Sequence, residues 1–168
     1  MIKAILIDAA ERDVREITLP DNEQARLDEL QRLVGGYIES AYRTPADDVL
    51  WVDEEGLFKP QRAFFRFAPR GDHPLAGNGV MVGAERLDRN GDWIGNRDPS
   101  LSVEQVRRAV TFLDRAYVDA WAKGNASEPA VVFYSLGRDG KVLTEDVLEH
   151  LGHVFGEIPR PEDEAKGE

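Results

Sequence analysis

The segment Leu33–Tyr42, which reads LVGGYIESAY, holds the boundary between a helix and a strand. Apolar side chains recur at helical spacing before the two glycines, and they predict a helix with one buried face. Gly35 and Gly36 then end that helix, because glycine adopts the left-handed cap conformation without steric cost. Residues 37–42 and 49–52 combine aromatic and aliphatic side chains, so we expect two strands joined by a loop.

Further strands are predicted on both sides of this segment. Residues 2–7 are almost continuously apolar and residues 14–19 alternate, as expected for two strands that pair across a short turn. Residues 79–85 predict another strand. The dipeptide Asn90-Gly91 follows it and favours a type I′ hairpin turn.

Helix-start signals occur at two places. Asp21 is expected to cap the helix that ends at the double glycine, with Gln24 three residues beyond it. Ser102 and Gln105 form a capping box, and the wide apolar stripe behind them predicts one continuous helix over residues 103–123. That breadth indicates packing against more than one element.

Strands and helices are interspersed without strict alternation, which predicts an α+β fold with a mainly antiparallel or mixed sheet and helices packed on it. A C-terminal helix-strand-helix appendage is expected to end in a strand over 130–134 and a helix over 144–155. We divide the chain into an N-terminal unit (1–97), an extension packed on it as one globule (98–158) and a flexible acidic tail (159–168).

Composition narrows the possible functions. The chain has 168 residues, no cysteine and a formal net charge of -11, from 32 acidic and 21 basic side chains. The lack of cysteine removes disulfides and zinc-thiolate sites, and the net charge disfavours direct nucleic-acid binding. No apolar run is long enough for a membrane helix, and no secretory signal is evident, so we expect a cytoplasmic protein.

Several motifs with a possible chemical meaning do not fit their mechanisms. Gly77–Gly83 precedes a strand, whereas a dinucleotide fingerprint must open a helix that receives the pyrophosphate. Ser135 does not lie in a nucleophile elbow. His150 and His153 share a flank of the last predicted helix, where an edge-of-core pair is the simpler interpretation than a metal site.

An acidic turn, Asp53-Glu54-Glu55-Gly56, follows the predicted strand over 49–52. Carboxylates at a strand end can bind hard cations or act as acids and bases, particularly with Glu39 on the neighbouring strand. The alternative is a solvated turn in which Gly56 supplies an unusual backbone angle. The residues of the turn alone leave both interpretations open.

Four short motifs resemble, in order, a small uncharacterised bacterial and phage family that is catalogued only as a domain of unknown function. The motifs are Leu33–Glu39, Val52–Leu57, Lys59–Ala63 and Gly77–Gly83. The resemblance covers residues 1–95 and implies an association with phages, plasmids and bacterial genomes, but no activity. This chain has Gln61 where the family usually has asparagine, and Asn78 where the family tends to have aspartate.

We therefore predict a non-catalytic binding or regulatory module with a recognition surface around the acidic turn. Backbone amides and Arg62 would hold a small polar or phosphorylated ligand, or a segment of a host or mobile-element protein. The predicted surface consists of Gly35, Gly36, Tyr37, Glu39, Asp53, Glu54, Glu55 and Arg62. No cofactor is expected.

Two other functions remain open on the sequence. Divalent-metal hydrolysis would use Asp53, Glu55 and Glu39 as ligands and bases. An acidic decoy for a host nucleic-acid-binding protein would use the net negative charge of the whole chain.

Overall fold

The computed structural model describes residues 1–60 and 63–124. Within these ranges, no helix is long and apolar enough to cross a membrane. The strand predicted over 130–134, the helix predicted over 144–155 and the acidic tail lie outside the described residues, as do Ser135 and the histidines at 150 and 153.

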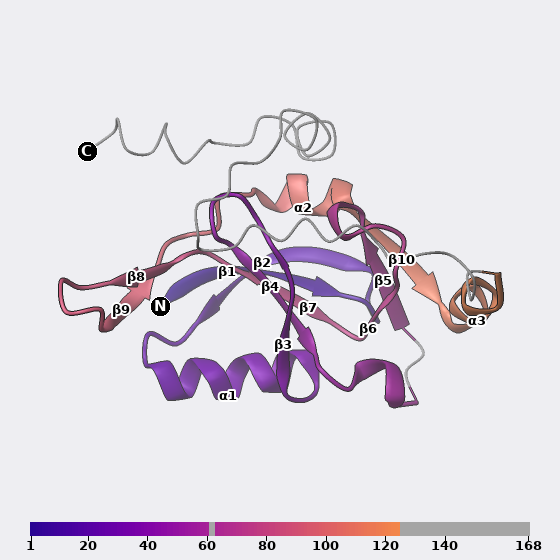
Figure 1. The fold of residues 1–168 in the computed structure, drawn as a ribbon, viewed down its shortest axis with the longest axis horizontal. Coiled ribbons are helices and arrows are strands. Elements are labelled where there is room, and N and C mark those ends of the chain that lie inside the picture. The colour runs from indigo at the N-terminus through magenta and orange to yellow at the C-terminus, as the bar shows by residue number, and fades with distance from the viewer. Residues whose placement is uncertain (61–62, 125–168) are drawn as a thin grey trace.

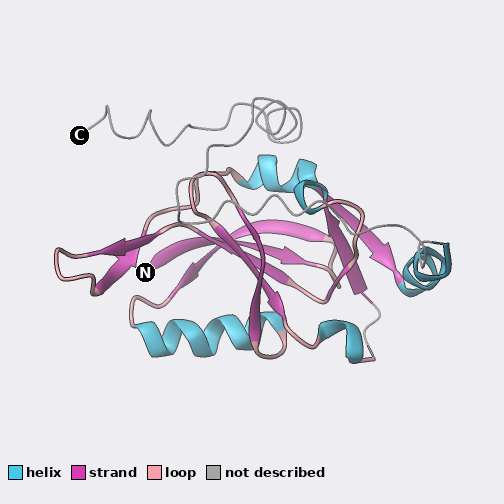
Figure 2. Cartoon of the chain, in the orientation of Figure 1, coloured by secondary structure: helices cyan, strands magenta, loops and turns pink. Residues whose placement is uncertain are grey.

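An antiparallel five-stranded sheet forms the middle layer (Figures 1 and 2). Its strands, in chain order, are β1 (Ile2–Asp8), β2 (Asp13–Leu19), β3 (Ile38–Arg43), β4 (Val49–Asp53) and β7 (Gly79–Val82). They lie in the order β2-β1-β7-β4-β3, and every neighbouring pair is antiparallel. With helices on both faces, this sheet confirms the predicted α+β class.

Helix α1 (Glu23–Val34) covers one face of the sheet. Leu30 and Val34 on the helix pack with apolar residues of β1, β2 and β7 in one core cluster. The predicted cap at Asp21 is wrong by one residue: Asn22 is the N-cap, because its side chain accepts a hydrogen bond from the amide of Ala25. The predicted glycine stop is confirmed, with Gly35 at φ +92°.

A second layer covers the opposite face. It contains α2 (Val103–Ala109) and a three-stranded antiparallel sheet in the order β10-β5-β6. Its strands are β5 (Ala63–Phe67), β6 (Leu75–Ala76) and β10 (Val110–Asp114). Leu101 and Val106 beside the confirmed capping box, together with Phe65 and Phe67, are buried in the largest core cluster.

The continuous helix predicted over residues 103–123 is wrong. Strand β10 interrupts it, and α3 (Arg115–Gly124) begins only afterwards. β10 pairs antiparallel with β5, and its Leu113 is buried against Phe64 and Val118. The apolar pattern of these residues is compatible with a helix and with a strand. Pairing with β5 selects the extended backbone at Val110-Thr111-Phe112.

A two-stranded hairpin of β8 (Glu85–Leu87) and β9 (Trp93–Asn96) extends from the sheet beyond β7 (Figure 1). The hairpin is confirmed, but its predicted type I′ turn is wrong. Between Asp88 and Asp92 only Gly91 has a positive φ, of +87°, whereas a type I′ turn needs two such residues. Asp88 instead closes a longer loop by accepting hydrogen bonds from the amides of Asn90 and Asp92.

Candidate functional site

Asp53, the centre of the predicted recognition surface, is a buried structural carboxylate. Its Oδ2 accepts a hydrogen bond from Lys59 Nζ at 2.7 Å, and its Oδ1 accepts one from the amide of Glu55 at 3.0 Å. Its side chain has no exposed surface. Both carboxylate oxygens are therefore engaged within the protein, in a bond pattern that joins the end of β4 to the turn after it.

The two glycines belong to the same arrangement. Lys59 Nζ also donates to the carbonyl of Gly35 at 2.9 Å, so one ammonium ties the end of α1 to Asp53. A Cβ atom on Gly36 would lie 2.5 Å from Lys59 Nζ and 2.6 Å from Asp53 Oδ1. Gly36 thus leaves the space in which the Asp53–Lys59 ion pair forms, so both glycines have a structural role at this point.

The other residues of the acidic turn lie at the surface. Glu54 and Glu55 are exposed, and the Glu54 amide donates to the carbonyl of Tyr37 at 2.8 Å. Tyr37 is 70% exposed and Phe58, in the single turn η1 (Gly56–Phe58), is 91% exposed. We call the exposed residues here the Tyr37–Phe58 surface, which comprises Tyr37, Glu54, Glu55, Leu57 and Phe58.

Glu39 and Asp53 do not lie on the same face of the sheet. In the β3–β4 ladder Glu39 lies opposite Val52, whereas Ile38 lies opposite Asp53. Since cross-strand partners share a face of the sheet, Glu39 and Asp53 project to opposite faces. Arg62 lies outside the described residues.

This arrangement also separates the carboxylates of the metal hypothesis. Asp53 pairs with Lys59, whereas Glu39 projects to the opposite face of the sheet. There the charge of Glu39 acts on Arg70: burial lowers the pKa of Arg70, and Glu39 partly offsets this effect. In the part of the chain that the structure describes, no three histidine or carboxylate side chains are placed to hold a metal ion together.

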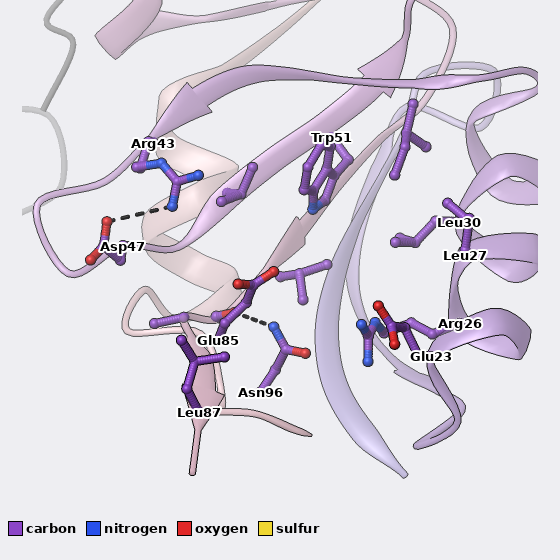
Figure 3. A pocket seen from close by; sticks show the side chains of 15 residues that line it. Glu23, Arg26, Leu27, Leu30, Arg43, Asp47, Trp51, Glu85, Leu87 and Asn96 are labelled. Atoms are coloured by element: carbon purple, nitrogen blue, oxygen red, sulfur yellow. Dashed lines mark hydrogen bonds and ion pairs between the residues drawn. The ribbon is translucent and has the colours of Figure 1, made fainter. Parts of the chain in front are cut away.

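A pocket of about 570 Å³ lies elsewhere, between the N-terminal half of α1, the β3–β4 pair and the base of the β8–β9 hairpin (Figure 3). Its apolar wall is formed by Leu27 and Leu30 from α1 and by Trp51 from β4. In Figure 3 the indole nitrogen of Trp51 points into the pocket. Its N–H has no hydrogen-bond partner among the described residues, so it is a donor available to a ligand.

Arg26 brings a positive charge to the pocket lining. Its side chain extends from α1 into the pocket (Figure 3), and its guanidinium carbon lies 3.9 Å from the centroid of the Trp93 ring. Its Nη1 is buried and has no hydrogen-bond partner within the described ranges. Burial lowers the pKa of Arg26, while the charges of Glu23 and Glu85 act in the opposite direction. The result is a partly desolvated cation with an unused donor.

The remaining walls are held by contacts within the protein. On the β3 side, Arg43 Nη1 and Asp47 Oδ1 lie 3.5 Å apart. On the hairpin side, Asn96 donates to the carbonyl of Gly83 at 2.8 Å and accepts from the indole of Trp93 at 3.3 Å. Because the Trp93 ring also lies against the guanidinium, a hydrogen bond and a cation–π contact together connect Asn96 of the hairpin to Arg26.

Sequence reasoning did not identify this pocket, and none of its lining residues belongs to the predicted surface. Its walls come from three segments that are separated in sequence. One signal was present: Arg26 precedes Leu30 by four residues, which places a cation on the apolar face of the predicted helix.

Comparison with known proteins gives a family but no activity. The model of the family described as domain of unknown function (DUF3846) matches residues 2–106. This match confirms the resemblance to an uncharacterised family and extends it through most of α2. No curated protein and no solved structure shows a significant match to the chain.

Proposed function

The chain belongs to the DUF3846 family of unknown function, and we propose that it is a non-catalytic module that binds a small polar ligand in the pocket between α1 and the β8–β9 hairpin. The observation that carries this proposal is the lining itself, in which the Arg26 guanidinium and the indole N–H of Trp51 lie beside an apolar wall. A volume of about 570 Å³ falls within the range of small-molecule sites.

The chemistry of the lining supports binding more than reaction. The described lining contains no serine, threonine, lysine or histidine, and of its three carboxylates Asp47 pairs with Arg43. Its polar groups are arginines, carboxylates, one amide and one indole. These groups orient a ligand by charge and hydrogen bonds.

A fragment screen on the full chain tests the proposal. Each fragment is added to protein labelled with ¹⁵N, and the indole N–H resonances of the three tryptophans are followed. The Trp51→Phe variant identifies the resonance of Trp51. We expect fragments that shift this resonance to raise the melting temperature and to lose affinity in Arg26→Met.

Arg32→Met is the matched control, because Arg32 lies on the same helix but pairs with Glu29 at the surface. The proposal fails if no fragment of any charge moves the Trp51 resonance. It also fails if Arg32→Met weakens binding as much as Arg26→Met.

A second candidate function is protein docking at the Tyr37–Phe58 surface. The exposure of Phe58, Leu57 and Tyr37 supports it, since large apolar side chains rarely gather in water without a partner. Glu54 and Glu55 beside them favour a host or mobile-element protein with a basic, apolar segment. A two-hybrid screen against phage and bacterial libraries should return interactors that Phe58→Ser loses and Trp51→Phe keeps.

The family resemblance supports a cytoplasmic role in phages, plasmids or their bacterial hosts. The acidic decoy receives less support, because basic side chains alternate with acidic ones in surface ion pairs such as Lys3–Glu16 and Arg107–Glu104. Fluorescence microscopy of a tagged chain in bacterial cells tests the location directly, and a signal confined to the envelope would contradict it.

A further inference from the structure

The first half of β3 is an open edge of the five-stranded sheet, and we propose that an extended segment of a partner protein adds to this edge as a further strand. The segment carries a lysine or arginine, followed by apolar residues. This inference rests on the second candidate function, protein docking beside Tyr37, because it states how such a partner is bound. It does not depend on the pocket.

The outer side of β3 presents backbone groups that no described residue pairs with. The carbonyl of Tyr37 accepts a hydrogen bond from the amide of Glu54 at 2.8 Å, so the backbone of Tyr37 bonds towards β4. The same register continues to Ser40, which lies opposite Trp51. Because bonding directions alternate along an antiparallel strand, Ile38 and Ser40 direct their amides and carbonyls outwards. These groups have no hydrogen-bond partner within residues 1–60 and 63–124.

The open part of the edge ends at Ala41. Arg70, the last residue of η2 (Ala68–Arg70), donates from its Nε to the carbonyl of Ala41 at 3.1 Å. The register also shifts between Ser40 and Tyr42, which marks a bulge at the same place. Residues 38–40 thus remain open, with two amides and two carbonyls available to a partner strand.

Glu39, at the centre of the open edge, favours a basic partner residue. Its side chain is exposed and forms no hydrogen bond or ion pair with a described residue, although its charge acts on Arg70. A lysine or arginine directly across from Glu39 would form a cross-strand pair of opposite charge. The exposed Glu54 and Glu55, after the neighbouring strand, add negative charge and favour the same kind of partner.

The residues before Glu39 favour apolar partner residues. Ile38 is half-buried, and Tyr37 is 70% exposed directly before the strand. Apolar side chains opposite them would remove this surface from water.

A second copy of this chain does not suit the edge. Two antiparallel β3 strands that use all of these outward groups must place Ile38 opposite Ser40. The two Glu39 side chains then lie directly across from each other, and like charges in this position are destabilising. The net charge of -11 adds repulsion between copies. The edge therefore suits a different chain with a basic segment.

Hydrogen exchange of the ¹⁵N-labelled full chain tests the edge with a defined probe, the acetylated hexapeptide Ser-Thr-Lys-Val-Phe-Ser. In the antiparallel register its lysine lies opposite Glu39 and its valine opposite Ile38. In the free protein, we expect the amides of Ile38 and Ser40 to exchange quickly and that of Glu39 slowly. The peptide should slow the exchange of Ile38 and Ser40 by about tenfold or more at saturation.

N-methylated peptides distinguish strand addition from docking through side chains. Methylation of the threonine or valine amide, which face β3, should weaken binding by about tenfold or more, whereas methylation of the lysine amide should change little. Glutamate in place of the peptide lysine should weaken binding by about fivefold, and Glu39→Lys should reverse this preference. Glu16→Lys, the same charge change on β2, is the control and should keep the preference for lysine.

Three results would overturn the inference. The first is a free protein in which the amides of Ile38 and Ser40 are already protected, and protection that rises with protein concentration would identify a second copy as the occupant. The second is a saturating peptide that protects neither amide. The third is equal binding by all the N-methylated peptides.

The two-hybrid assay separates these results from a failure of protein docking. Ser40→Pro removes an outward amide and is tolerated on an edge strand. Strand addition predicts that Ser40→Pro and Glu39→Lys lose the interactors. If only Phe58→Ser loses them, a partner docks through side chains and strand addition is wrong. If Phe58→Ser keeps them as well, protein docking at this surface fails.

Discussion

Asp53 Oδ2 and Lys59 Nζ lie 2.7 Å apart and hold three elements together. Asp53 ends β4, Lys59 follows η1, and the same ammonium donates to the carbonyl of Gly35 after α1. The acidic turn of the sequence therefore contains one buried carboxylate with a structural function and two exposed ones without such contacts in the described chain. This distinction gives the first prediction.

Asp53→Asn should reduce the free energy of unfolding by about 1–3 kcal/mol, because it leaves a partly buried ammonium without its charged partner. Glu54→Gln, one residue away and exposed, should stay within about 0.5 kcal/mol of the parent protein. Urea denaturation followed by circular dichroism measures both. An unchanged midpoint for Asp53→Asn would show that the carboxylate is not needed by the fold and would return it to the list of functional candidates.

Gly36→Ala should destabilise the protein through a clash. The new Cβ would lie 2.5 Å from Lys59 Nζ and 2.6 Å from Asp53 Oδ1, so the ion pair must open or shift, at a cost of about 1–3 kcal/mol. In a Lys59→Met background one of the two charged partners is already lost. The same alanine should therefore cost less there, and equal costs in both backgrounds would rule out the clash as the cause.

Local signals in the sequence were sufficient for the parts of the fold that neighbouring residues determine. The end of α1 follows from Gly35 and Gly36 alone, and the capping box at Ser102 and Gln105 appears as predicted. The break at Val110 could not be predicted in the same way. Its cause is the ladder with β5, whose residues lie more than forty positions earlier in the chain.

The candidate site shows the same limit. Asp53 and the double glycine can be recognised as a motif from neighbouring residues. Their structural role depends on the position of the Lys59 side chain, which the sequence does not give. The pocket forms where α1, β4 and the β8–β9 hairpin come together in the fold, and no local sequence pattern predicts this tertiary contact. Only Arg26, a cation on the apolar helix face, gave a sign of it.

Gly83→Ala should disrupt the wall of the pocket at the hairpin. A Cβ there would lie 2.1 Å from the carbonyl oxygen of Arg97 and 2.7 Å from the backbone of Asp98, neither of which can rotate away. We expect a loss of about 1–3 kcal/mol in unfolding free energy and weaker binding of any pocket ligand. Gly91→Ala is the comparison, because Gly91 has a positive φ but no described atom within 4 Å. It should cost stability and leave ligand affinity intact.

Glu29 and Arg32 give a prediction for pH. The guanidinium of Arg32 holds the pKa of Glu29 below its ordinary value of 4.5 through two hydrogen bonds, of 2.6 and 2.8 Å. A carboxylate whose pKa is lowered by folding stabilises the protein above its unfolded pKa, and this contribution is lost as the pH falls through the folded value. Glu29→Gln should therefore melt below the parent protein at pH 7, and this difference should shrink as the pH falls below 4.5. A difference that stays constant as the pH falls would exclude the carboxylate charge as its source.

Asp48 and Ser100 join the β3–β4 loop to the segment that leads into α2. The Asp48 side chain, in a residue 1% exposed, accepts hydrogen bonds from the amide and the hydroxyl of Ser100, and the amide of Ser100 lies 2.9 Å away. The Asp48 amide in turn donates to the hydroxyl of Thr44 at 3.0 Å. This buried carboxylate connects residues near 45 with residues near 100.

Asp48→Asn should cost about 1.5–3 kcal/mol, because charge-assisted hydrogen bonds to a buried carboxylate are replaced by weaker ones. Asp47→Asn is a close control: Asp47 is exposed, and its positive φ of 65° is tolerated by asparagine. A chain of residues 1–97 lacks Ser100 and the buried Leu101 and Val106, so it should show no cooperative unfolding transition. Cooperative unfolding of residues 1–97 with the midpoint of the full chain would show instead that this segment is not part of the folding unit.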